Sequence, residues 1–138
     1  MLHYGEPTIS RLQLKKVSEV LKRKYITQGE ETKKFEKSLA KKLGCKYCVV
    51  VSSGTAALHL AGKSLGWKSG DIIICTPITF VASCNSILFN NASPYFVDVE
   101  KYNNNLNPLK LENTIKRFTR LKKKIKAVIV TDLGGTLA

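Results

Sequence analysis

The sequence contains no apolar run long enough to cross a bilayer, and its start, MLHYGEPTIS, lacks the basic and apolar regions of a signal peptide. We therefore expect a cytoplasmic protein with no membrane partner. Of the 138 residues, 43% are hydrophobic, which is ordinary for a soluble globular protein. This length suffices for one domain, or a piece of one, with a sizeable core.

Cysteine is scarce, and only Cys45 and Cys48 have the spacing of a pair of metal ligands. The other two, Cys75 and Cys84, are too far apart to complete the pattern of a zinc site. On a strand, residues three apart point to opposite faces, so Cys45 and Cys48 converge only if a turn lies between them. Against the alternative of a structural zinc, we favour reduced thiols that pack as small apolar side chains, and we expect no metal.

Acidic residues are also few: 10 of them stand against 23 basic residues, which gives a formal net charge of +13. Clusters of basic residues can bind a phosphate backbone, so a basic nucleic-acid-binding domain is an alternative function. Only four of the basic residues are arginine, the usual reader of base edges. The clusters also fall on the polar faces of expected helices, where solvated lysine is the simpler interpretation, so we disfavour a nucleic-acid partner.

The periodicity of apolar residues changes along the chain. Helical spacing predicts helices over 10–24 and 30–43, the second ended by Gly44, and short apolar runs then alternate with helical stretches. Continuous apolar strands suit a sheet covered on both faces, so we expect an α/β fold with a mainly parallel sheet flanked by helices. Residues 1–45 would form a helical N-terminal segment, and 46–138 would form βα repeats. We expect strands at 47–51, 72–75, 94–97 and 127–131, and helices at 55–65, 79–89 and 108–120.

A small polar turn at Ser53-Gly54-Thr55-Ala56 joins an expected strand to an alanine-rich helix. In open α/β sheets, ligands bind beyond the carboxyl ends of strands, where a helix N-terminus offers free N–H groups. Gly54 would let the backbone approach an anion, and the hydroxyls of Ser53 and Thr55 could donate to phosphate oxygens. The alternative is that Ser53 or Thr55 simply caps the helix. Neither a P-loop pattern nor GxGxxG is present, so a nucleoside triphosphate or NAD is not indicated.

The next βα unit places an aromatic residue, Phe80, after the following strand. Its ring could cover the face of a planar heteroaromatic ligand at the same pocket. For an isolated phenylalanine, however, a core position is the commoner role.

Six segments, in this order, together resemble the DegT/DnrJ/EryC1/StrS family of pyridoxal-phosphate-dependent sugar aminotransferases. The resemblance spans nearly the whole chain and implies the large domain of the aspartate aminotransferase fold, fold type I. The segments are 25–29 (YITQG), 35–36 (FE), 51–58 (VSSGTAAL), 70–71 (GD), 79–83 (TFVAS) and 94–98 (PYFVD).

The resemblance also implies roles for individual residues. The cofactor phosphate would be held by Ser53, Gly54, Thr55 and Ala56, with Phe80 stacked on the pyridine ring and Ser83 nearby. Four further residues resemble segments near the entrance for the nucleotide sugar, although a purely structural role is the alternative: Tyr4, Thr27, Gln28 and Gly29.

Members of this family typically transfer an amino group, often from glutamate, to a keto group on a nucleotide-linked deoxysugar. Their products feed surface polysaccharides, glycans or glycosylated natural products. Family members are homodimers with active sites shared across the interface, so the resemblance implies a homodimer here too.

The resemblance further indicates what this sequence lacks. The family's transaminases use a lysine that forms a Schiff base with the cofactor and an acid that faces the pyridine nitrogen, and both lie on segments later than Ala138. Asp132 falls one βα unit too early to be that acid. We therefore expect no catalytic residue, weak or absent cofactor binding and no activity of the chain alone, with the C-terminal domain absent. A family branch with histidine in place of the lysine dehydrates sugars, so a sugar dehydratase is another alternative.

Overall fold

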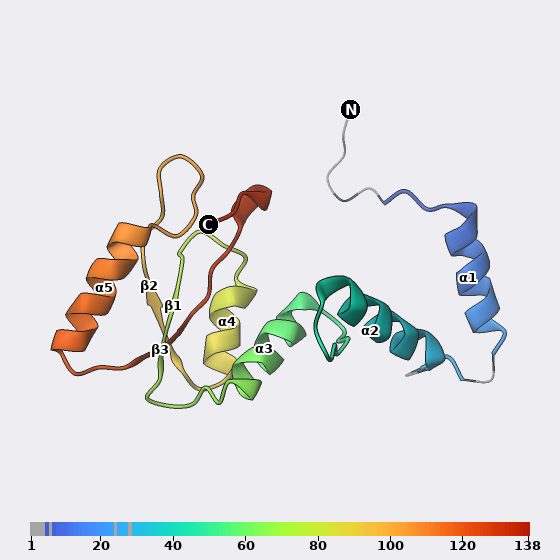
Figure 1. The fold of residues 1–138 in the computed structure, drawn as a ribbon, viewed down its shortest axis with the longest axis horizontal. Coiled ribbons are helices and arrows are strands. Elements are labelled where there is room, and N and C mark those ends of the chain that lie inside the picture. The colour runs from blue at the N-terminus through green and yellow to red at the C-terminus, as the bar shows by residue number, and fades with distance from the viewer. Residues whose placement is uncertain (1–4, 6, 24, 28) are drawn as a thin grey trace. The chain divides into compact units, whose positions relative to one another are not determined.

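A computed structural model describes residues 5, 7–23, 25–27 and 29–138, and the chain divides into two compact units, Met1–Val50 and Val51–Ala138 (Figure 1). Each unit is described by itself. Within the described residues, no helix is both long enough and apolar enough to cross a membrane.

The first unit contains two helices, α1 (Arg11–Leu21) and α2 (Glu30–Leu43). Ser10 caps α1: its hydroxyl accepts from the N–H of Gln13 at 3.3 Å, and the Gln13 side chain accepts from the N–H of Ser10 at 2.6 Å. This reciprocal pair is a capping box, so α1 begins after Ser10 and is shorter than the helix expected over 10–24. The bounds expected for α2 are confirmed, because Gly44 adopts the left-handed conformation, with φ 66°, that ends a helix.

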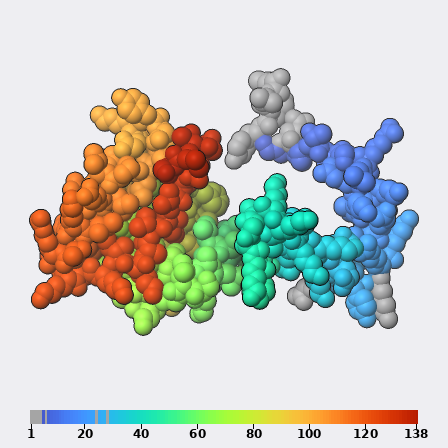
Figure 2. Space-filling view, viewed as in Figure 1, coloured from blue at the N-terminus to red at the C-terminus, as the bar shows by residue number. Residues whose placement is uncertain are grey.

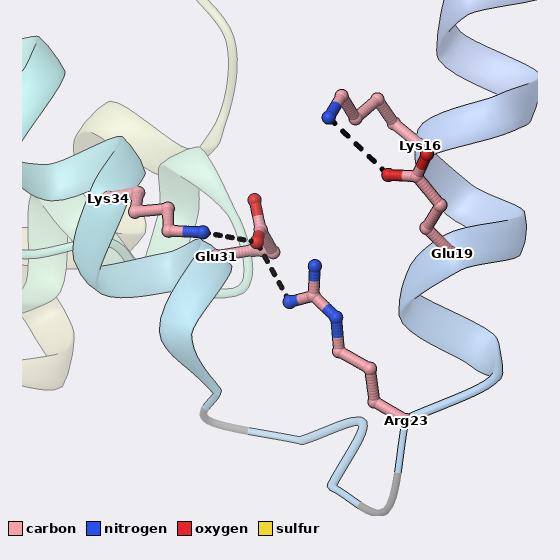
Figure 3. A network of polar contacts seen from close by, with 5 residues as sticks. All are labelled: Lys16, Glu19, Arg23, Glu31 and Lys34. Carbon is pink, nitrogen blue, oxygen red and sulfur yellow. Dashed lines mark hydrogen bonds and ion pairs between the residues drawn. The ribbon is translucent and has the colours of Figure 1, made fainter.

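Glu31 lies at the centre of a polar network at the start of α2 (Figure 3). Its Oε1 accepts from Arg23 at 2.8 Å and from Lys34 at 2.9 Å. The Arg23 guanidinium, followed by the Lys34 ammonium, lowers the pKa of Glu31 from 4.5 to about 2. The three side chains remain accessible to solvent, so salt screens this network.

The second unit is built on a parallel sheet of three strands, β1 (Ile72–Cys75), β2 (Ser93–Phe96) and β3 (Ile125–Val128), in the order β2-β1-β3. Ile74 of β1 lies opposite Tyr95 on one side and Val128 on the other. The central strand is therefore hydrogen-bonded along both edges.

Helices cover both faces of this sheet (Figure 1). On one side lie α3 (Gly54–Ser64) and α4 (Ala82–Phe89), and on the other side lies α5 (Pro108–Arg120). Ile73 and Cys75 pack with Ile87 of α4 and with Trp67, while Ile74 packs with Leu111 of α5 and Val97. The expected α/β fold with a parallel sheet flanked by helices is confirmed.

Several expected bounds in the rest of the chain are wrong, and those of α3 and β2 are shifted by a single residue. Residues 47–51 form no strand, because no described strand pairs with their backbone; the N–H of Val50 donates instead to Oε1 of Glu36 at 3.0 Å. Helix α4 begins at Ala82 rather than Thr79, because residues 76–81 form a turn in which the Phe80 carbonyl accepts from the N–H of Ser83 at 3.0 Å. Strand β3 covers Ile125–Val128, so it begins two residues before and ends three residues before the expected range 127–131.

Asn105 links a loop to the last residues of the chain. The loop is closed by an antiparallel bridge between Val99 and Leu106, and the Asn105 side chain within it is 1% exposed. Its Nδ2 donates to the carbonyl of Thr136 at 2.8 Å, and its Oδ1 accepts from the N–H of Leu133 at 2.9 Å. Figure 2 shows the resulting contact between the orange loop and the red C-terminal segment. The loop and the segment are thus held by one buried amide.

Gly62 is the point of close contact between α3 and its neighbours. A Cβ atom on Gly62 would lie 2.4 Å from Cε3 of Trp67 and 2.6 Å from Nδ2 of Asn90. The same Nδ2 donates to the carbonyl of His59 on α3 at 3.2 Å. Only glycine therefore permits α3 to pack this closely against Trp67 and the end of α4.

We expect Gly62→Ala to lower the free energy of unfolding by about 1–3 kcal/mol, because the added methyl group overlaps ring and amide atoms. Urea unfolding followed by fluorescence of the single tryptophan, Trp67, measures this loss. Gly54→Ala is the matched control on the same helix, since a Cβ there meets nothing within 4 Å. Equal stability of the two variants would contradict the close contact.

Low pH is expected to remove the contribution that the ionised Glu31 carboxylate makes to the stability of the folded state. Because its folded pKa lies below the ordinary value of 4.5, its stabilisation is complete above that pH and is lost as the pH falls toward about 2. An NMR titration of the Glu31 carboxyl should show this low midpoint, and ~0.5 M NaCl should raise it by screening. Arg23→Gln should also raise it, whereas Lys33→Gln, whose lysine pairs with Glu30 at 3.6 Å, should not. An unmoved midpoint in Arg23→Gln would refute the assignment.

Candidate functional site

The connection between α3 and β1 determines where the candidate phosphate site lies. Residues 65–71 join the C-terminus of α3 to the first residue of β1, and the C-terminal half of α3 lies against Asn90 at the end of α4, so this half lies toward the end of the sheet where β1 begins. The N-terminus of α3, at Ser53, therefore lies toward the end of the sheet where β1 finishes. This is the end at which open α/β sheets bind ligands.

Of the two expected N-cap residues, Ser53 and Thr55, it is Ser53 that caps α3. Its backbone is extended, with φ −161° and ψ 161°, and its Oγ accepts from the N–H of Ala56 at 3.2 Å. A hydroxyl that accepts one hydrogen bond still has its own proton to donate. Capping therefore leaves the Ser53 hydroxyl able to donate to an anion, while Ala56 is engaged with Ser53.

The start of α3 is electropositive and open. The first turn contains no acidic residue, so no carboxylate offsets the positive end of the helix dipole. The first N–H groups of a helix have no partner within it, and these include those of Gly54 and Thr55. A Cβ on Gly54 would meet nothing within 4 Å, so there is space for a small anion to approach the backbone.

Phe80 lies in the turn between β1 and α4, and its side chain is 75% exposed. Phe80 therefore does not occupy the core position that is the commoner role of an isolated phenylalanine. An exposed ring beyond the carboxyl end of β1 presents a face that can cover a planar ligand.

Ser83, unlike Phe80, is buried, with 7% exposure. Its hydroxyl oxygen lies 3.1 Å from that of Thr79, which lies 3.1 Å from that of Thr131. Ser83 thus contacts Thr79, the residue before Phe80, and its hydroxyl helps to hold the turn that carries the aromatic ring.

The residues expected near a nucleotide-sugar entrance belong to the first unit. Tyr4 and Gln28 lie outside the described residues. Thr27 is exposed, and Gly29 is the N-cap residue of α2, with φ −88°. The role of all four in substrate binding remains a prediction.

Thr131 is a residue beside the candidate site that the sequence interpretation did not single out. The available signal was its position: it directly follows the apolar run 127–130, so its polar side chain stands where a parallel strand ends. Its pairing with Thr79, 52 residues earlier, could not be read from either segment alone.

The cysteines offer no metal site within the described part of the chain, where no group of three or more potential ligands gathers. All four thiols are free. Burial, followed by the neighbouring Cys84, raises the pKa of Cys75 to about 11, so this thiol stays protonated and packs as part of the core.

Comparison with known proteins gives a family match over nearly the whole chain. A sequence model of the DegT/DnrJ/EryC1/StrS aminotransferase family matches residues 7–138. The spore coat polysaccharide biosynthesis protein SpsC of Bacillus subtilis is 36% identical over 134 residues, which cover 97% of this chain and 33% of SpsC. A UDP-4-amino-4,6-dideoxy-N-acetyl-beta-L-altrosamine transaminase of Helicobacter pylori is 36% identical over 134 residues, covering 96% of this chain and 34% of the transaminase.

A solved structure agrees with these matches. Helicobacter pylori PseC, an aminotransferase involved in the biosynthesis of pseudoaminic acid, is 33% identical and superposes with a TM-score of 0.87. The superposition covers 99% of this chain and 35% of PseC. The chain thus spans about a third of the length of the relatives it matches.

If the start of α3 binds phosphate, Gly54→Ala should weaken that binding without unfolding the protein. The added methyl group enters the space in front of Gly54 and keeps an anion away from the backbone N–H groups. We expect roughly a 10-fold loss of affinity for inorganic phosphate, the order of one charge-assisted hydrogen bond, measured by phosphorus NMR titration. Ala57→Gly, on the same helix, serves as a control. Unchanged phosphate affinity in Gly54→Ala would exclude this site.

Proposed function

Because the chain belongs to the DegT/DnrJ/EryC1/StrS aminotransferase family, we propose that it forms the phosphate-binding part of a pyridoxal-phosphate-dependent sugar aminotransferase. The observation that carries the proposal is the open, uncompensated helix start at Gly54, which lies toward the same end of the sheet as the exposed ring of Phe80. This chain would correspond to the N-terminal part of the large, cofactor-binding domain.

The residues present fit the phosphate of this cofactor. A phosphate monoester needs several hydrogen-bond donors and a positive potential, and a helix N-terminus supplies both. Gly54 and Thr55 offer backbone N–H groups, and the hydroxyls of Ser53 and Thr55 add donors. Ala56 would act indirectly, because its N–H orients the Ser53 hydroxyl that it bonds at 3.2 Å.

The ring of the cofactor would be held by Phe80. When bound, pyridoxal phosphate supplies an electron sink that allows an amino group to be exchanged for a carbonyl oxygen. Phe80 would cover one face of the ring and exclude water from it. Ser83 would keep the turn in place through its contact with Thr79 at 3.1 Å.

The acceptor, we propose, is a keto group on a nucleotide-linked deoxysugar, and the amino donor is glutamate or a similar amino acid. The support is that one relative is a transaminase for a UDP-linked amino-dideoxy sugar. A second relative takes part in spore coat polysaccharide biosynthesis, which favours a role in making amino sugars for surface polysaccharide or glycan. Thr27 and Gly29, with Tyr4 and Gln28, would line the nucleotide-sugar entrance, and the complete enzyme would be a homodimer.

The proposal is tested with pyridoxamine 5'-phosphate, which is fluorescent and, unlike the aldehyde, forms no imine with the 19 lysines of the chain. We expect weak binding that inorganic phosphate displaces. Phe80→Ala should weaken it roughly 2- to 10-fold, the order of one aromatic stacking contact, while leaving the affinity for inorganic phosphate unchanged.

Tyr102→Ala is the matched control for loss of a solvent-exposed aromatic ring, because Tyr102 is 98% exposed in the loop before α5. This variant should bind pyridoxamine 5'-phosphate like the parent chain. The proposed function would be contradicted if inorganic phosphate did not displace pyridoxamine 5'-phosphate and Phe80→Ala did not weaken its binding.

A further inference from the structure

The turn that carries Phe80 is exposed at its tip and anchored at its base. Phe80 and Val81 are 75% and 60% exposed, whereas Thr76, where the turn begins, is 1% exposed. The hydroxyl of Thr76 donates to the carbonyl of Ile78 at 3.1 Å. An exposed ring can cover a ligand reproducibly only if the backbone beneath it is held, so the anchors of this turn bear on its function.

Thr79, the residue before Phe80, is held by side chains from two different elements. Its hydroxyl oxygen lies 3.1 Å from Oγ of Ser83 on α4 and 3.1 Å from Oγ1 of Thr131, which follows β3. Because β3 pairs with β1 in parallel, the chain leaving β3 runs beside the chain leaving β1. The N–H of Ile129 continues this pairing by donating to the carbonyl of Ile74 at 2.8 Å.

The three hydroxyls form a chain in which Thr79 is the middle member. A hydroxyl has one proton and two acceptor sites, so Thr79 can accept from one neighbour and donate to the other. Such a chain fixes the Thr79 side chain from both sides, and each bond polarises the next. Without the Thr131 hydroxyl, the Thr79 hydroxyl keeps, among the described residues, a side-chain partner only on α4, the element that the turn itself enters.

We propose that Thr131 is a positioning residue that acts through Thr79 to hold the Phe80 ring over the cofactor. The inference rests on the proposed function, because the ring that Phe80 would cover belongs to the cofactor. Thr131 lies beyond the end of β3, and its hydroxyl contacts the turn that carries Phe80 through Thr79. Its effect should therefore fall on the ring contact and leave the phosphate contacts at α3 unchanged.

The test compares Thr131→Val, which keeps the shape of the side chain but removes the hydroxyl, with Thr131→Ser, which keeps the hydroxyl. Thr119→Val is the control, because its hydroxyl bonds the Ile115 carbonyl at 2.9 Å on α5, across the sheet from α4. Each chain is titrated with pyridoxamine 5'-phosphate and with inorganic phosphate. Hydrogen–deuterium exchange of residues 79–83 is measured in the absence of ligand.

We expect Thr131→Val to bind pyridoxamine 5'-phosphate roughly 2- to 10-fold more weakly, the order of one hydrogen bond, with unchanged affinity for inorganic phosphate. Exchange of residues 79–83 should be faster in this variant. Thr131→Ser and Thr119→Val should match the parent chain in all three measurements.

Parent-like ligand affinity and exchange in Thr131→Val would overturn this inference without touching the proposed function, and so would an equal loss of affinity in Thr131→Ser. Equal weakening of both ligands in Thr131→Val would also overturn it, because that indicates general damage. A parent chain that binds inorganic phosphate but not pyridoxamine 5'-phosphate would instead refute the proposed function, and this inference with it.

Discussion

The burial of β1 between two layers of helices is the constraint on which the Val51–Ala138 unit depends. Ile73, Ile74 and Cys75 have no exposed surface, and successive side chains enter cores on opposite faces of the sheet. A strand enclosed in this way must pair its backbone groups within the protein, and β2 and β3 provide partners along its two edges. The carboxyl end of β1 is consequently a fixed point from which the turn carrying Phe80 departs.

The proposed phosphate site at the start of α3 depends on the same core through a different set of contacts. Gly62 allows α3 to approach Trp67 and Asn90 closely, and Trp67 packs in the cluster that includes Ile73. A helix is stiff over the eight residues that separate Gly62 from Gly54, so contacts at one end determine the position of the other. The open N-terminus of α3 and the turn before α4 are therefore both held by the β1 core, at a distance from the exposed residues that would meet a ligand.

The elements of the second unit were predictable where the sequence pattern was local. The four residues of β1 form a continuous apolar run, and Pro108 at the first turn of α5 is a recognised start signal, so both appear at the predicted bounds. Residues 47–51 have an equally strong β pattern but form no strand, because pairing depends on a partner distant in sequence. The role of Thr131 was not predictable for the same reason, since it depends on a contact with Thr79, 52 residues earlier in the sequence. The cap at Ser53, by contrast, involves atoms within one turn and was foreseen as one of two possibilities.

Asn105 has a consequence for how pieces of this fold can be exchanged between homologues. Its amide satisfies both Leu133 and Thr136, so the 99–106 loop and the 133–136 segment are chemically complementary parts of one unit. Both partners are backbone groups, so a chimaera that takes the loop from one relative and the segment from another keeps these bonds only if the new segment follows the same backbone path; otherwise each orphaned group costs about 1–3 kcal/mol. The two stretches lie about thirty residues apart in sequence, and exchanging them together is the way to preserve both hydrogen bonds of the Asn105 amide.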